Sequence, residues 1–84
     1  METPLSDPDL IRRRNEEASA WMHRGMDVLA EAAPSASKLE EAVGHFDRAI
    51  ALRRTLPLAE NPFFRYGLSA GWINRGDAFA RIGG

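Results

Sequence analysis

The chain contains no cysteine, and it contains no long apolar run. Without cysteine there is no disulfide framework, no thiolate nucleophile and no thiolate metal ligand. No segment approaches the roughly 20 apolar residues of a membrane-spanning helix, and residues 1–7 lack the basic and apolar regions of a signal peptide. Because small exported domains usually depend on disulfides, we expect a cytoplasmic protein with no membrane partner.

The chain also lacks an excess of charge of either sign, because 11 Lys and Arg nearly balance 12 Asp and Glu. Such a balance creates no overall field to attract nucleic acid. The basic run Arg12, Arg13 and Arg14 winds around a predicted helix and is followed by Glu16 and Glu17. A solvated helix face is therefore the better interpretation, and we predict no nucleic-acid partner.

The composition that remains, 44% hydrophobic and 27% charged over 84 residues, is that of one small folded domain. A chain of this size buries only about 60% of the surface that its unfolded form exposes. We therefore expect a thin core within residues 8–84, preceded by an N-terminal tail over residues 1–7.

Capping residues and helical periodicity predict three helices, over residues of about 8–32, 38–55 and 62–82. Ser6 or Asp7 caps the first helix and Pro8 opens it, Ser37 forms a capping box with Glu40, and Asn61 precedes the proline that opens the third. The third helix carries an apolar stripe at helical spacing: Phe64, Leu68, Trp72, Phe79 and Ile82. No stretch alternates as a strand does, so the predicted class is all-α.

Five glycines fall inside these predicted helices: Gly25, Gly44, Gly67, Gly71 and Gly76. Each costs about 1 kcal/mol relative to alanine in a helix interior. We infer that some of them lie where a neighbouring helix approaches too closely for a side chain.

An internal repeat relates residues 21–27 to residues 72–78, 51 positions later. Both copies carry Trp, then Arg three positions on, then Gly. Together with the spacing of Ala42, Phe46 and Ala49 in the second helix, this resembles the tetratricopeptide repeat (TPR), a helix-turn-helix of 34 residues. The chain has longer inserts than that repeat and ends where the second helix of a second repeat should begin.

The resemblance implies an antiparallel helical hairpin plus a third helix, a right-handed solenoid fragment of about one and a half repeats. It also implies that a protein or peptide partner binds in a groove between the first helices, without catalysis. Mapped onto this chain, the groove positions include Ser19 and Ala70, and the partner-binding residues are Met22, His23, Met26, Ile73, Asn74, Asp77 and Arg81. Methionine adapts its shape to varied apolar partners, although Met22 and Met26 could equally be core residues. Arg24 and Arg75 stand either at the edge of this groove or against a carboxylate such as Asp47.

A second hypothesis is self-assembly. Because the third helix lacks the expected partner helix, its apolar side could form a homo-oligomer, either as a dimer or by a swap of this helix between chains. The same gap would arise if the chain were a piece of a longer TPR array. Truncating Trp72 should cost about 3 to 5 kcal/mol if the repeated motif is core.

Catalytic and metal chemistry have little support. The only histidines, His23 and His45, lack the companion ligands of a metal site. Paired acids such as Glu40 and Glu41 at a helix start more often complement the helix dipole than catalyse. We expect no enzyme activity, no metal and no cofactor.

Overall fold

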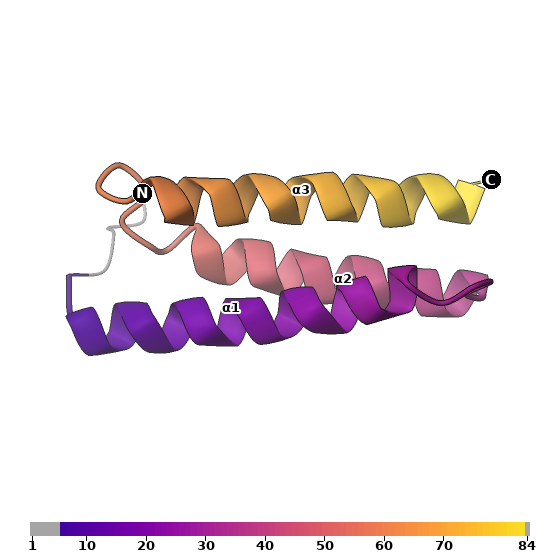
Figure 1. The fold of residues 1–84 in the computed structure, drawn as a ribbon, viewed down its shortest axis with the longest axis horizontal. Helices are drawn as coiled ribbons and strands as arrows, with labels where there is room; N and C mark the ends of the chain where they lie inside the picture. The colour runs from indigo at the N-terminus through magenta and orange to yellow at the C-terminus, as the bar shows by residue number, and fades with distance from the viewer. Residues whose placement is uncertain (1–5, 84) are drawn as a thin grey trace.

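The computed structural model describes residues 6–83 of the chain. Three helices make up the fold: α1 (Pro8–Leu29), α2 (Ala36–Arg53) and α3 (Pro62–Gly83). The described residues contain no strand, so the predicted all-α class with three helices is confirmed. Figure 1 shows α1 and α3 running in the same direction with α2 antiparallel to them. Helix α2 packs along both neighbours, whereas α1 and α3 hardly touch each other.

Side-chain caps begin all three helices. Asp7 Oδ1 accepts a hydrogen bond from the backbone N–H of Asp9 at 2.9 Å, and Asn61 Oδ1 accepts from that of Phe63 at 2.9 Å. Both caps precede a proline, which loses no hydrogen bond in the first turn. These two starts lie where the sequence predicts them.

The start of α2 differs from the prediction. Ser35, not Ser37, is the cap, and its Oγ accepts from the backbone N–H of Lys38 at 3.2 Å. The earlier start adds a helical bond from Leu39 N–H to the Ser35 carbonyl at 3.0 Å. Since Lys38 now stands where the capping box needs an acid, that box does not form, and the prediction that Ser37 pairs with Glu40 is wrong.

Helices α1 and α2 pack most closely where Phe46 lies against Gly25. Phe46 is fully buried, and a Cβ built on Gly25 would come within 2.5 Å of its ring. Alanines let the helix backbones approach, and the core cluster draws on all three helices: Ala18, Met22, Ala42, Phe46, Ala49 and Ala78. A few small side chains and one aromatic ring therefore hold the three helices together.

Helices α2 and α3 also meet through small residues. The buried positions of α3 are Gly71 and Ala78, and a Cβ at Gly71 would lie 2.9 Å from Ile50 Cγ1. A Cβ at Gly67 would meet the side chain of Arg53 at 2.8 Å. The predicted close approach is thus found at Gly25, Gly67 and Gly71 and is absent at Gly44 and Gly76, where nothing lies within 4 Å.

Two aromatic residues of the predicted apolar stripe of α3 lie outside the core. Trp72 is 51% exposed and Phe79 is 59% exposed, so neither belongs to the core. The reason is steric, because α3 turns its smallest residues toward α2 and its aromatic rings are carried to other sides of the helix.

One of the two alternatives for Arg75 is realised. Its Nε donates to Asp47 Oδ1 and forms an ion pair between α3 and α2. Arg24 instead lies over the ring of Trp21. Within residues 6–83, no helix has the length and hydropathy of a membrane span.

Candidate functional site

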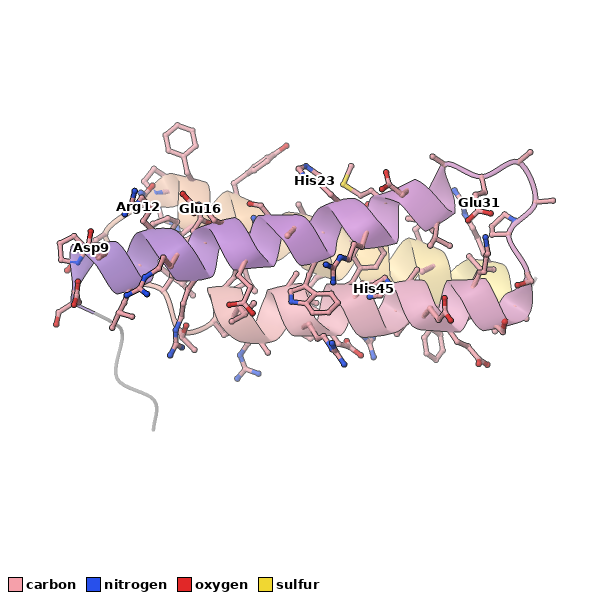
Figure 2. All side chains as sticks on the ribbon, turned by 90° about the horizontal axis from the view of Figure 1, so that it is seen from below. Asp9, Arg12, Glu16, His23, Glu31 and His45 are labelled. Atoms are coloured by element: carbon pink, nitrogen blue, oxygen red, sulfur yellow. The ribbon has the colours of Figure 1, made fainter. Side chains whose placement is uncertain are left out.

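The principal candidate site is a groove between α1 and α3, with part of α2 at its base. Its volume is about 300 Å³, and residues of all three helices line it: Asn15, Ser19, Met22, His23, Met26, Arg53, Phe63, Phe64, Tyr66, Gly67 and Ala70. Figure 2 shows α2 on one side of the molecule and His23 and Glu16 projecting on the other. The groove follows from the fold, since α1 and α3 both pack on α2 and hardly touch each other.

Apolar side chains with differing exposure form the groove walls. On α1, Met22 is buried while Met26 is half exposed. On α3, Phe63 and Tyr66 are 80% and 76% exposed. Large exposed apolar side chains beside a cavity are typical of a surface that a partner covers.

The base of the groove is charged. Arg53, on the last turn of α2, is only 8% exposed, and its Nη2 donates to Ser19 Oγ at 3.1 Å. Its Nε is buried and has no hydrogen-bond partner among the described residues. No carboxylate of residues 6–83 forms an ion pair with it. Burial lowers the pKa of Arg53 from its ordinary value, because it disfavours the charged form.

Polar side chains tie α1 to the rest of the fold near the two ends of the groove. Arg14 donates to Thr55 Oγ1 at 3.1 Å, which joins the start of α1 to the turn after α2. Arg81 donates to the Leu29 carbonyl at 3.0 Å, which joins the end of α3 to the end of α1. Asp77 accepts from Arg81 at 3.2 Å and orients it. These bonds hold the two walls in place.

The structure gathers only some of the predicted partner-binding residues in the groove. Met22, His23 and Met26 line it, as do Ser19 and Ala70. The four residues predicted on α3 do not: Ile73 is 71% exposed, Asn74 is half-buried, and Asp77 and Arg81 pair with each other. Binding by any of these residues stays a prediction.

Sequence reasoning missed Arg53 and the aromatic pair Phe63 and Tyr66 as site residues. A signal for Arg53 exists, since it follows Ala49 by four positions and so continues the buried face of α2. A charged residue in such a register indicates a buried polar contact. No comparable signal places Phe63 and Tyr66, because their role depends on how α3 lies beside α1.

A second cluster lies on the outer side of the α1–α2 hairpin. The ring of Trp21 stacks on His45 with centroids 5.4 Å apart. The guanidinium groups of Arg24 and Arg48 each lie 4.5 Å from the Trp21 ring centroid. Such cation–π contacts stabilise the hairpin by about 0.5 to 1 kcal/mol each at exposed sites. This cluster is fully explained by helix packing.

The two histidines have different environments. His23 lines the groove, whereas His45 stacks on Trp21. The part of the chain that the structure describes holds no group of three or more His, Asp or Glu side chains arranged for a metal ion. Comparison with protein-family models, with curated proteins and with solved structures finds no match to this chain. The function therefore has to be argued from the groove itself.

Proposed function

We propose that this chain is a TPR-like protein-interaction module that binds a peptide or a helix of another protein in the groove between α1 and α3. The observation that carries the proposal is an open groove with exposed apolar walls above a buried arginine. Binding here needs no covalent chemistry, and we propose a cytoplasmic location because small exported domains usually depend on disulfides.

Two further features support the proposal. The repeated Trp, Arg and Gly positions resemble the first helix of a TPR, and the helices that carry them, α1 and α3, run parallel to each other and antiparallel to α2. The walls also combine rigid aromatic rings with flexible methionines, residue types that are enriched in protein interfaces.

The test is selection of peptides from a random display library on the wild-type chain, followed by affinity measurements on two variants. Ala70→Trp fills the groove, and Ala80→Trp adds the same ring on an exposed position of the same helix. We expect the selected peptides to bind Ala70→Trp at least about tenfold more weakly and Ala80→Trp unchanged. A library that yields no binder, or binders that ignore Ala70→Trp, would contradict the proposal.

A second candidate function is self-assembly through α3. It is favoured by a separate exposed face that carries Trp72 and Phe79 around Gly76, where nothing lies within 4 Å. Apolar rings beside an uncovered glycine could accept a helix of a second copy. Static light scattering over a range of concentrations tests this candidate, and a mass that stays monomeric throughout would exclude it. If the chain does assemble, Phe79→Asp should return it to a monomer.

A further inference from the structure

We propose that the groove recognises an acidic residue, Glu or Asp, within an apolar segment of another protein, and that Arg53 binds its carboxylate. This inference rests on the proposed function and specifies the chemical group of the ligand that the groove recognises. It is carried by the burial of Arg53, by its unmet hydrogen-bonding capacity and by its place between two apolar parts of the groove.

A buried cation without a counter-ion is costly. The free energy of transferring a charge out of water is recovered only when the charge is paired and hydrogen-bonded. In residues 6–83, Arg53 is 8% exposed and its one hydrogen bond goes to a neutral hydroxyl, that of Ser19. A guanidinium group carries five N–H donors in a planar fork that matches a carboxylate, so a carboxylate is the ligand that it lacks.

The position of Arg53 along the groove favours an internal acidic residue over a chain terminus. Arg53 contacts Ser19 of α1 and lies against Gly67 of α3. Because α1 and α3 run parallel, Phe63 lies toward the start of the groove and Met26 lies beyond Arg53. A segment with apolar residues before and after its acid would cover both parts, whereas a terminal carboxylate would leave one part uncovered.

The experiment titrates the ¹⁵N-labelled full chain with blocked peptides. The probe is acetyl-Ser-Leu-Glu-Leu-Ser-amide, and its matched control replaces Glu by Gln. A third peptide, acetyl-Ser-Leu-Gln-Leu, ends in a free carboxylate. Shifts of the Arg53 Nε–H signal and of the backbone signals of Met22, Met26 and Phe63 report where each peptide binds.

We expect the Glu peptide to bind the wild-type chain about tenfold or more tightly than the Gln peptide, since hydrogen bonds to charged groups are the stronger kind. Arg53→Met, which keeps the volume and removes the charge, should abolish this preference. Arg54→Met removes the same charge from an exposed neighbour and should preserve it.

Three results would overturn the inference. Equal affinities for the Glu and Gln peptides, with shifts of the NMR signals of groove residues, would agree with the proposed function but exclude a role for the acidic residue. Tighter binding of the free-carboxylate peptide would assign the site to a chain terminus. A dimer in light scattering that dissociates in Arg53→Met would mean that a second copy supplies the carboxylate. Absence of any groove shifts would instead contradict the proposed function itself.

Discussion

The same short motif occurs twice in this molecule, and the two copies have different environments. In α1, Gly25 receives the ring of Phe46, and Trp21 is partly buried between cationic side chains of α1 and α2. In α3, the corresponding Gly76 has nothing within 4 Å, and Trp72 is half exposed. Local sequence thus sets which residues share a helix face, while a neighbouring helix decides whether that face becomes core.

The two helices also differ at the positions that α3 buries. Helix α3 buries Gly71 and Ala78 against α2, and the α1 positions that correspond to them are Ala20 and Asp27, both exposed. Helix α1 therefore has one covered face and one polar, solvent-facing face, whereas α3 has one covered face and one apolar, uncovered face.

The largest effect on stability should come from Phe46, the side chain that packs against Gly25 in the buried copy of the motif. Phe46→Ala removes a fully buried ring and is expected to lower the free energy of unfolding by about 3 to 5 kcal/mol. Phe79→Ala, on the uncovered copy, should cost less than about 1 kcal/mol. Urea denaturation followed by circular dichroism measures both changes. Similar losses for the two variants would show that α3 is covered in solution.

The next largest effect is the change in stability on replacing Gly25 or Gly76 by alanine, which should have opposite signs at the two positions. Gly25→Ala places a methyl group 2.5 Å from the Phe46 ring and should destabilise by about 1 to 3 kcal/mol. Gly76→Ala meets open space and should stabilise by about 1 kcal/mol through helix propensity. Thermal melts of the two variants are the measurement. A destabilised Gly76→Ala variant would indicate that a partner occupies that face.

A smaller difference is expected between the two tryptophans. Trp21→Leu loses two cation–π contacts and the stack on His45, and should cost about 1 to 2 kcal/mol. Trp72→Leu loses a single longer contact, with Arg75 5.9 Å from the ring centroid, and should change stability by less than about 0.5 kcal/mol. Tryptophan fluorescence of the two single-tryptophan chains gives an independent check, because Trp72 should emit at longer wavelength.

The smallest effect concerns the loop that brings α2 back onto α1. Lys38 donates to Glu31 at 2.9 Å, and this hydrogen bond, followed by the attraction of the two charges, raises the pKa of Lys38. A raised lysine pKa stabilises the fold below the ordinary value of 10.5, and the contribution is lost as pH rises above it. A double-mutant cycle with Lys38→Met and Glu31→Gln should give a coupling near zero at neutral pH. A coupling as large as the stability loss expected for Trp21→Leu would contradict this prediction.

Much of the fold could be predicted from the sequence, because its signals are local. Asp7 and Asn61 are capping residues placed before prolines, and the period of α2 identifies Phe46 and Ala49 as buried. The start of α2 was missed by two residues, since Ser35 and Ser37 are equally good caps and only the position of the loop selects between them.

The candidate site could be predicted only in part. Met22, His23 and Met26 follow from one helix face of the resembled repeat, and all three line the groove. Arg53 and Phe63 enter it through the packing of α2 and α3, which depends on contacts between residues far apart in the chain.

The sequence by itself determined that this chain forms three helices and where small residues allow them to approach, because propensity, capping and periodicity act over a few residues. The tertiary structure alone decided which copy of the repeated motif is covered and which charge is buried. The physical reason is that a helix face is buried only when a second surface packs against it. Gly25 and Gly76 carry the same local information, and only one of them has a neighbour.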